Sequence, residues 1–273
     1  MDINTKTKLN NGVEMPALGL GTYMMRSGTE TEKAVLWALD AGYRLIDTAT
    51  LYENERSVGE AIKKSRVPRE EVFVTTKLWN DDHGYKRAVE AFQESSGKLG
   101  LDYIDLYLIH WPVEGLRGES WGALEALLAD GKCRAIGVSN YTVRHLEELI
   151  ESSKTVPAVN QVEFSPYLFQ SELLEYCRAK DIRLEAYSPL TRGARLSDPE
   201  LIRMAERYGK TTAQVLVRWA LQHEVVVIPK SSHKDRIREN AEVFDFSISP
   251  DDMDRLDSLD EDLHTDWDPA GAP

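Results

Sequence analysis

Features that would place this chain outside the cell or in a membrane are scarce in its sequence. Only two of its 273 residues are cysteines, Cys133 and Cys177, so there is no disulfide framework and no metal-ligand spacing. No stretch is apolar enough to span a bilayer, and the first residues, MDINTKTKLN, contain no apolar core of a secretory signal. We therefore expect a cytoplasmic protein in which both cysteines are buried structural residues.

Basic residues are few relative to acidic ones. Lys and Arg total 33 against 46 Asp and Glu, which gives a formal charge of -13. This balance argues against nucleic acid and anionic membranes as general partners, because both attract positively charged surfaces. An anionic ligand would need a local cationic pocket, and a few side chains suffice because screening shortens the overall repulsion to about 8 Å at physiological salt.

The chain instead shows a regular alternation of short apolar runs and helical patterns. The runs are rich in β-branched and apolar residues without strict alternation, which is typical of parallel strands covered on both faces. Eight of them are LGLGTY at 18, YRLID at 43, VFVTTK at 72, YIDLYLIH at 103, RAIGVSN at 134, AVNQVEF at 158, RLEAYS at 183 and VVVIPK at 225.

Between the runs, apolar residues recur three and four positions apart, as Val35 and Leu39 do, which predicts helices with one buried face. Thr142, Thr212 and Ser249 followed by proline are predicted amino-terminal caps. About eight strand and helix repeats fit a closed (β/α)8 barrel, a TIM barrel, better than an open sheet of five or six strands.

The two ends of the chain carry signals of their own. Asn11-Gly12 lies between two short extended pieces and predicts a β-hairpin that closes one end of the barrel. The length allows two small domains, but no stretch rich in Gly, Ser and Pro divides the chain. We expect one domain over residues 1–273 with a frayed tail, DWDPAGAP.

Polar side chains stand where several predicted strands end. Asp47, Lys77 and His110 end neighbouring strands, and Tyr52 follows Asp47 in DTATLYENE. Each has a structural explanation if taken alone: Asp47 as a helix cap, Lys77 as a surface residue, His110 as a core histidine. Because the carboxyl ends of barrel strands converge on one face, their joint placement predicts a shared site.

These four side chains suit protonation of a carbonyl oxygen. A tyrosine, with a pKa of about 10, gives up its proton poorly at neutral pH. A neighbouring Lys77 ammonium would lower the pKa of Tyr52, Asp47 would keep that ammonium charged, and His110 could hydrogen-bond a substrate oxygen. None of the four can supply a hydride, so this interpretation requires a cofactor.

The usual dinucleotide fingerprint is absent, because Gly19-x-Gly21 is followed by no third glycine at the required spacing. The other cationic feature is IPKSSHKDRIREN, residues 228 to 240, which leaves a strand and enters a helix. It is either a solvated basic turn or a phosphate site at a helix amino terminus, and the acidic context favours the phosphate site.

Taken together, these segments resemble the aldo-keto reductases. The resemblance runs from GLGTY to beyond IREN and is carried by GYRLIDTATLYENERSVG (42–59), RAIGVSNY (134–141), IPKSSHKDRIREN (228–240), VTTKLW and LIHWP. It implies a (β/α)8 barrel that binds NADPH along the rim without a Rossmann fold and reduces aldehydes or ketones to alcohols. It also implies a monomer.

The resemblance further implies roles for individual residues. Tyr52 would be the general acid, Lys77 and Asp47 would tune it, and His110 would position the carbonyl. The walls of the substrate pocket would be Tyr23, Trp79 and Trp111, together with His110. The implied cofactor residues are Tyr187 stacking on the nicotinamide; Ser139, Asn140 and Gln161 at its carboxamide; Gly21, Thr22, Asp47, Ser188 and Leu190 along its length; Lys230, Ser231, Ser232 and Arg236 at the 2'-phosphate; and Glu239 and Asn240 at the adenine.

Short segments after Trp111 and Asn240 favour small carbonyls, namely methylglyoxal, simple aldehydes, aldoses or keto-sugar acids, as in the similar bacterial diketo-gluconate and glyoxal reductases. A barrel that binds NADPH as a sensor, without turnover, is a second hypothesis, and the intact set of four polar residues argues against it. A metal-dependent hydrolase is a third, but the six histidines show no paired spacing for a metal.

Overall fold

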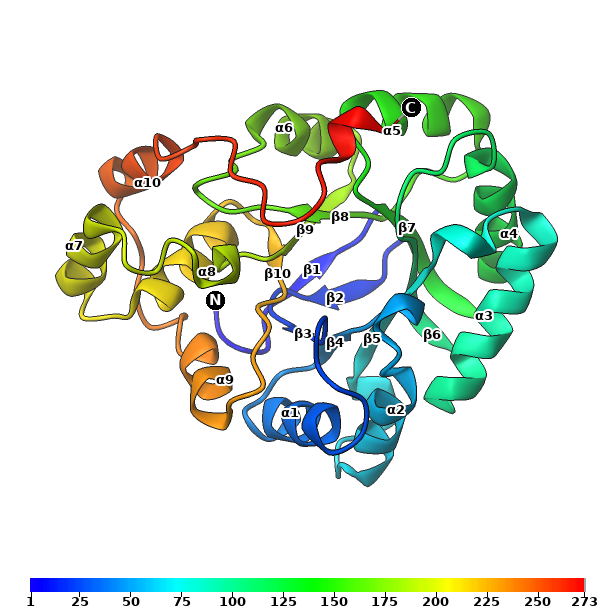
Figure 1. The fold of residues 1–273 in the computed structure, drawn as a ribbon, viewed down its shortest axis with the longest axis horizontal. Coiled ribbons are helices and arrows are strands. Elements are labelled where there is room, and N and C mark those ends of the chain that lie inside the picture. Colours follow the sequence, from blue (N-terminus) through cyan, green and yellow to red (C-terminus); the bar gives the residue numbers. More distant parts are fainter. Residues whose placement is uncertain (273) are drawn as a thin grey trace.

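A ring of eight parallel strands, surrounded by helices, forms the centre of the computed structural model, which describes residues 1–272 (Figure 1). The strands pair in chain order from β3 to β10, and parallel bridges from Leu18 to Val227 and from Gly21 to Lys230 join the first strand to the last. The predicted (β/α)8 barrel is therefore confirmed. Its strands are β3 Leu20–Gly21, β4 Leu45–Asp47, β5 Phe73–Leu78, β6 Ile104–Ile109, β7 Cys133–Ser139, β8 Val159–Glu163, β9 Arg183–Tyr187 and β10 Val226–Val227.

The helices bury one apolar face each against the outside of this ring, as Val35 and Leu39 do. Thr142 and Ser249 are the predicted caps, whereas the cap predicted at Thr212 is one residue earlier, at Thr211. The helices are α1 Thr29–Asp40, α2 Glu55–Lys64, α3 Tyr85–Leu99, α4 Arg117–Ala129, α5 Val143–Ser152, α6 Ser171–Ala179, α7 Pro199–Tyr208, α8 Thr212–Gln222, α9 Lys234–Ala241 and α10 Pro250–Asp257, with short 3-10 turns η1 Thr50–Tyr52, η2 Arg69–Glu71, η3 Asn80–Asp82, η4 Thr191–Gly193 and η5 Pro269–Gly271.

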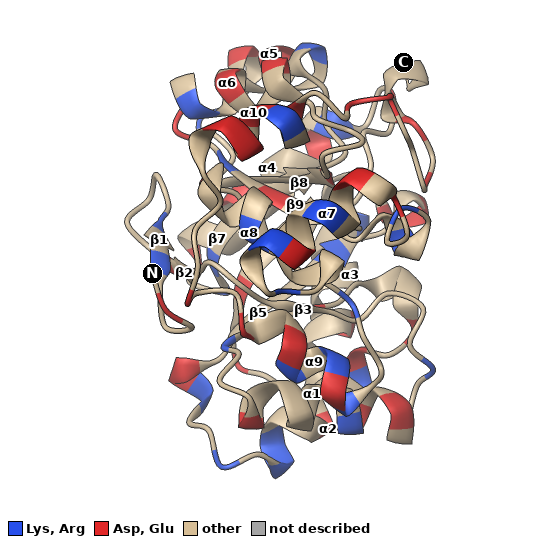
Figure 2. Ribbon diagram, turned by 90° about the vertical axis from the view of Figure 1, so that its left-hand side faces the viewer, with Lys and Arg blue, Asp and Glu red and all other residues tan. Residues whose placement is uncertain are grey.

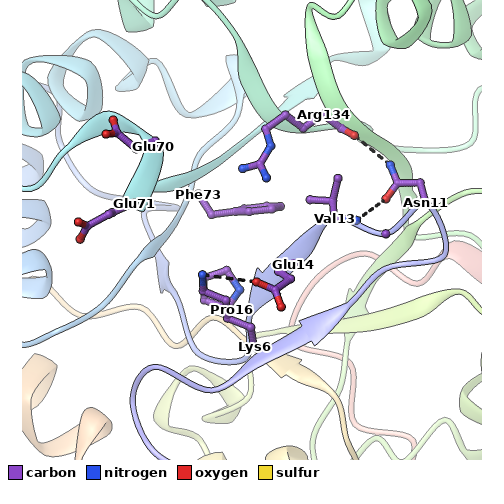
Figure 3. A pocket seen from close by; sticks show the side chains of 10 residues that line it. Lys6, Asn11, Val13, Glu14, Pro16, Glu70, Glu71, Phe73 and Arg134 are labelled. Carbon is purple, nitrogen blue, oxygen red and sulfur yellow. Dashed lines mark hydrogen bonds and ion pairs between the residues drawn. The ribbon is translucent and has the colours of Figure 1, made fainter.

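An antiparallel hairpin, β1 Lys6–Lys8 with β2 Glu14–Pro16, covers the amino-terminal end of the ring, as predicted. Its turn contains Gly12 at φ 86°, a conformation that favours glycine. Leu9 and Met15 of this segment pack into the apolar cluster that fills the ring at the end covered by the hairpin. A polar hollow of about 510 Å³ lies beside the hairpin, with Phe73 and Arg134 in its wall (Figure 3).

The C-terminal segment lies at the other end of the barrel from the hairpin (Figure 2). The prediction of a frayed tail is wrong at Ala272, which is 3% exposed, although most of residues 266–271 are exposed. The carbonyl oxygen of Ala272 accepts hydrogen bonds from Arg144 Nη2 at 2.5 Å and pairs with His145 Nε2 at 3.2 Å. These partners lie more than a hundred residues away, so local composition could not reveal them. Pro273 lies outside the described residues.

Cys133 and Cys177 are both buried and free, as predicted. Among the described residues, no helix has the length and apolarity needed to cross a membrane.

Candidate active site

A cavity of about 960 Å³ opens where the strands end, at the face opposite the hairpin. Nearly all of the residues predicted for the site line it, although they come from segments spread over the whole chain. They are Gly21, Tyr23, Asp47, Tyr52, Trp79, His110, Trp111, Ser139, Asn140, Gln161, Tyr187, Ser188, Leu190, Lys230, Ser231, Ser232, Arg236, Glu239 and Asn240.

Two of the predicted residues lie behind the cavity wall. Thr22 is fully buried, and its hydroxyl donates a hydrogen bond to the carbonyl oxygen of Asp47 at 2.9 Å. Lys77 is also fully buried, beneath Tyr52. Both residues therefore support groups that face the cavity.

The Lys77 ammonium joins strand β5 to strand β4. Its Nζ lies 2.7 Å and 2.8 Å from the two carboxylate oxygens of Asp47, and it donates to the carbonyl oxygen of Thr48 at 3.0 Å. The same nitrogen is 3.3 Å from Tyr52 Oη. Tyr52 ends the short turn η1, which brings its phenol back over the strand ends. The buried ion pair of Lys77 and Asp47 thus contacts the hydroxyl of Tyr52 through the Lys77 ammonium.

The acidity of Tyr52 differs from the sequence-based expectation. Lys77 is close, as predicted, but burial and the charge of Asp47 raise the pKa of Tyr52 well above 10 instead of lowering it. The carboxylate neutralises the ammonium, so desolvation of the phenolate decides the direction. Tyr52 therefore holds its proton at neutral pH.

His110 follows the last residue of β6 and faces the Tyr52 ring edge-on, with the ring centroids 5.8 Å apart. Burial, helped by the charge of Lys77, lowers the pKa of His110 well below 6.5. The imidazole is therefore neutral at physiological pH. Its Nδ1 is buried and has no hydrogen-bond partner among the described residues.

A second carboxyl group, Glu185 on β9, extends the network and was not predicted. The Gln161 side-chain amide donates to Asp47 Oδ2 and to Glu185 Oε2, both at 2.8 Å. Glu185 is fully buried, and this burial raises its pKa to about 8. The sequence signal was a lone acidic residue inside an apolar strand, two positions before Tyr187.

Side-chain hydrogen bonds also tie together the ends of β6, β7 and β9. The Asn140 amide donates to the carbonyl oxygen of His110 at 3.0 Å, and Tyr187 Oη donates to Asn140 Oδ1 at 2.9 Å. Asn140 has a left-handed backbone, φ 63°, which asparagine tolerates better than most residues. The amide and the ring of Tyr187 are thus held at fixed positions on the cavity wall.

Several cavity residues were missed, most of them in loops, in short 3-10 turns, at the start of α8 and in the predicted tail. The aromatic wall continues from Trp111 to Trp267, whose ring centroid is 4.8 Å away. Asp266 forms an ion pair with Arg192. The only sequence signal was a tryptophan beside charged residues in a segment without periodicity. The other cavity-lining residues that sequence reasoning missed are Met24, Leu51, Asn80, Pro189, Gly193, Leu196, Thr211, Thr212, Ala213, Ile228 and His233.

The model of the aldo/keto reductase family matches residues 17–261 of this sequence. The chain belongs to the aldo/keto reductase family. A glyoxal reductase of Bacillus subtilis is 52% identical to it over 255 residues, which cover 93% of this chain and 92% of the relative. A morphine 6-dehydrogenase of Pseudomonas putida is 51% identical over 267 residues, covering 92% and 90% of the two chains.

Solved structures of other aldo-keto reductases share the fold. A crystal structure of an aldo-keto reductase from a deep-sea metagenome library has a TM-score of 0.94 and 46% identity, and covers 96% of this chain and 97% of that one. An aldo-keto reductase of Bombyx mori, in complex with NADP, has a TM-score of 0.90 and 37% identity, with coverage of 97% and 95%. This aldo/keto reductase is an NADP-dependent oxidoreductase that acts on carbonyl groups.

Among residues 1–272, no three His, Cys, Asp or Glu side chains are grouped so that they could hold a metal ion. Near Tyr52 the cavity instead presents a phenol, an imidazole, amides and the Asp47 carboxylate, which suit hydrogen bonding and proton transfer.

Proposed function

We propose that this reductase converts small aldehydes and ketones to alcohols with NADPH, and that Tyr52 is the general acid. The observation that carries the proposal is the contact between Tyr52 Oη, on the cavity wall, and Lys77 Nζ of a fully buried ion pair, at 3.3 Å. When bound, the reduced nicotinamide supplies the hydride. The side chains of this protein supply the proton and hold the carbonyl.

Tyr52 delivers its proton to the carbonyl oxygen as that oxygen gains negative charge. Because the pKa of Tyr52 is well above 10, the proton is present at neutral pH. Loss of the proton creates a phenolate 3.3 Å from the Lys77 ammonium, which stabilises it. Asp47 holds that ammonium in place with both carboxylate oxygens. The ion pair therefore favours the state that follows proton transfer.

His110 positions the carbonyl oxygen. A neutral imidazole carries one N–H, and the buried Nδ1 of His110 has no acceptor among the described residues. We assign that proton to Nε2, which would then donate a hydrogen bond to the substrate oxygen. Since the pKa of His110 is well below 6.5, this donor stays neutral and does not compete with Tyr52 for the acid role.

We propose that the same cavity holds the dinucleotide phosphate. At one end, the Tyr187 ring, held by the hydrogen bond from its hydroxyl to Asn140, would stack on the nicotinamide, and the amides of Asn140 and Gln161 with the Ser139 hydroxyl would hold the carboxamide. At the other end, the amino terminus of α9 contributes N–H groups that suit an anion. We propose that the following residues surround the 2'-phosphate and the adenine: Lys230, Ser231, Ser232, Arg236, Glu239 and Asn240. Gly21, Thr22, Asp47, Ser188 and Leu190 would support the stretch between.

The substrate would lie among Tyr23, Trp79, His110 and Trp111, which line the cavity next to Tyr52. Methylglyoxal and related dicarbonyls are the first candidates, since a 52% identical relative is a glyoxal reductase. Simple aldehydes, aldoses and keto-sugar acids follow. The aromatic walls around Tyr52 suit compact carbonyl compounds.

Replacing Tyr52 with Phe tests the acid. We expect kcat with methylglyoxal to fall by about 10²- to 10⁴-fold, because a positioned proton donor contributes about that much. NADPH binding, measured by quenching of tryptophan fluorescence, should stay nearly unchanged. Tyr23→Phe is the matched control, because its ring lies 4.9 Å from that of Tyr52 on the same wall. Turnover of Tyr52→Phe within twofold of wild type would disprove the assignment.

A further inference from the structure

The last residue of β8, Glu163, is a buried carboxylate outside the set that the proposed mechanism uses. Its side chain accepts hydrogen bonds from a segment about one hundred residues later in the chain. The Thr265 N–H lies 3.0 Å and 3.1 Å from its two oxygens, the Thr265 hydroxyl also donates to it, and the Asp266 N–H is 3.3 Å away. With Glu163 only 4% exposed, this contact fixes the path of the later segment.

That segment, residues 261–272, is held on both sides of Glu163. On one side, the N–H groups of Glu261 and Leu263 donate to the carbonyl oxygen of Tyr167 at 3.2 Å and 2.9 Å. On the other side, Ala272 is bound by side chains of α5. We call residues 261–272 the strap. In Figure 1 it runs from α10 towards α5 across the carboxyl end of the ring. Glu163 binds the strap at Thr265 and Asp266, directly before Trp267.

Two strap residues next to this contact face the cavity. Trp267 packs on Trp111, with ring centroids 4.8 Å apart, yet remains 57% exposed. Asp266 pairs with Arg192, whose guanidinium lies 5.4 Å from the centre of the Tyr23 ring. The strap thus supplies one indole and one carboxylate to the entrance of the substrate pocket.

We propose that Glu163 is a positioning residue for substrate selectivity: it holds the strap so that Trp267 and Trp111 together contact a planar, apolar substituent on the carbonyl carbon. This inference rests on the proposed function, because it needs the carbonyl at Tyr52. An aryl aldehyde reaches both indoles. A compact dicarbonyl such as methylglyoxal has no group that extends to Trp267, so its turnover does not depend on the strap.

Glu163→Gln tests the inference with little change in volume. The new side chain has one acceptor oxygen and one NH2 group, and that NH2 group opposes the donors of Thr265 and Asp266. Glu125 on α4 offers a matched control, because it accepts from the N–H groups of Lys154 and Thr155 at 2.9 Å and 2.7 Å and does not line the cavity. Glu125→Gln therefore breaks an equivalent tie elsewhere in the fold.

Steady-state kinetics of wild type, Glu163→Gln, Trp267→Ala, the double variant and Glu125→Gln would be compared with 4-nitrobenzaldehyde and methylglyoxal. We expect KM for the aryl aldehyde to rise about 3- to 10-fold in Glu163→Gln and in Trp267→Ala, the loss of an aromatic contact. The KM of the double variant for the aryl aldehyde should not exceed that of Trp267→Ala. In all variants, kcat for the aryl aldehyde and both kinetic constants for methylglyoxal should change little. Glu125→Gln should leave both substrates unaffected.

The inference would be overturned if Glu163→Gln raised KM equally for both substrates. It would also be overturned if Glu163→Gln raised KM for the aryl aldehyde as much in the Trp267→Ala background as in wild type. A second readout does not require turnover: chymotrypsin should cleave after Trp267 faster in Glu163→Gln than in wild type or Glu125→Gln. Equal cleavage rates would show that Glu163 does not hold the strap. If the wild type reduced neither carbonyl, the proposed function would fail, while the cleavage rates would still decide the role of Glu163.

Discussion

At the scale of single residues, the interior of the barrel holds one carboxyl group, that of Glu185, for which the proposed reaction has no use. Asp47 is paired with Lys77, but Glu185 shares only the Gln161 amide, and its Oε1 has no partner among the described residues. An ionised Glu185 would add an uncompensated negative charge near Asp47. With a pKa of about 8, Glu185 is mostly protonated at neutral pH, which keeps the network close to neutral.

This predicts a pH-dependent stability that Glu185→Gln removes. The pKa of Glu185 is about 8 in the folded protein against 4.5 ordinarily, so between these values the folded state binds a proton that the unfolded chain has lost. Stability then falls as the pH rises, by about 1 kcal/mol per pH unit, and the loss is complete above pH 8. Urea unfolding at pH 5, 7 and 9 should show wild type losing stability relative to Glu185→Gln.

Exposed Glu175 on α6 provides the control for this comparison, through Glu175→Gln. A stability difference between wild type and Glu185→Gln that stays constant from pH 5 to 9 would mean that Glu185 ionises normally.

Arg236 on α9 should decide the preference for NADPH. It lines the cavity near the helix amino terminus, where a phosphate is favoured. Arg236→Ala should weaken NADPH binding about 10- to 100-fold, the value of a charge-assisted hydrogen bond, and change NADH binding little. Fluorescence titration with both cofactors measures this. Arg238→Ala removes an exposed arginine from the same helix but outside the cavity, so a similar NADPH loss there would point to general charge attraction.

The residues that sequence reasoning found and missed differ in one physical respect. Asp47, Lys77 and His110 stand at strand ends, and the geometry of a barrel alone brings strand ends together. Glu163 and Glu185 are also at or near strand ends. However, the partners of Glu163 belong to the C-terminal strap, and the partner of Glu185 is the side-chain amide of Gln161. Trp267 lies in a segment with no periodicity. Its position depends on contacts that no local pattern encodes.

At the scale of elements, the predicted strands were all found, and most are shorter than the apolar runs that predicted them. The run from Val225 to Lys230 contains only two residues in strand conformation, Val226–Val227. Helix α7 was not predicted, although Asp198 caps it and Pro199 opens it. Apolar runs report burial, which extends beyond the paired residues.

Helix packing gives a sharp prediction at Gly59. On α2, a Cβ at this position would meet the backbone carbonyl of Leu99 far inside contact distance, and a backbone cannot move aside as a side chain can. Gly59→Ala should therefore lower the free energy of unfolding by about 2–3 kcal/mol. Gly97→Ala on α3 meets nothing within 4 Å and should instead raise it by about 0.5–1 kcal/mol, through helix propensity. Urea unfolding of both variants measures the contrast, and equal effects would refute it.

At the scale of the whole molecule, the charge of -13 is spread over the surface. Lys and Arg are interspersed with Asp and Glu on the helices (Figure 2). Such mixing limits the long-range field, so the cationic residues around α9 can act locally on an anionic cofactor. The pattern of eight repeats was sufficient to predict the barrel because each strand and helix unit needs the next to cover its apolar face.

Closure of the ring by the bridge between Leu18 and Val227 ties the first strand to the last, so we expect the chain to unfold as one domain. Thermal unfolding followed by far-UV circular dichroism and by tryptophan fluorescence should give coincident transitions. NADP⁺ at 100 times its Kd should stabilise the folded state by about 2.7 kcal/mol and move the whole transition up by several degrees. Two domains would respond differently: one transition would shift with the cofactor and the other would stay. Coincident curves that shift together are therefore the result that a single barrel requires, because the residues proposed to hold the cofactor come from strands all around the ring.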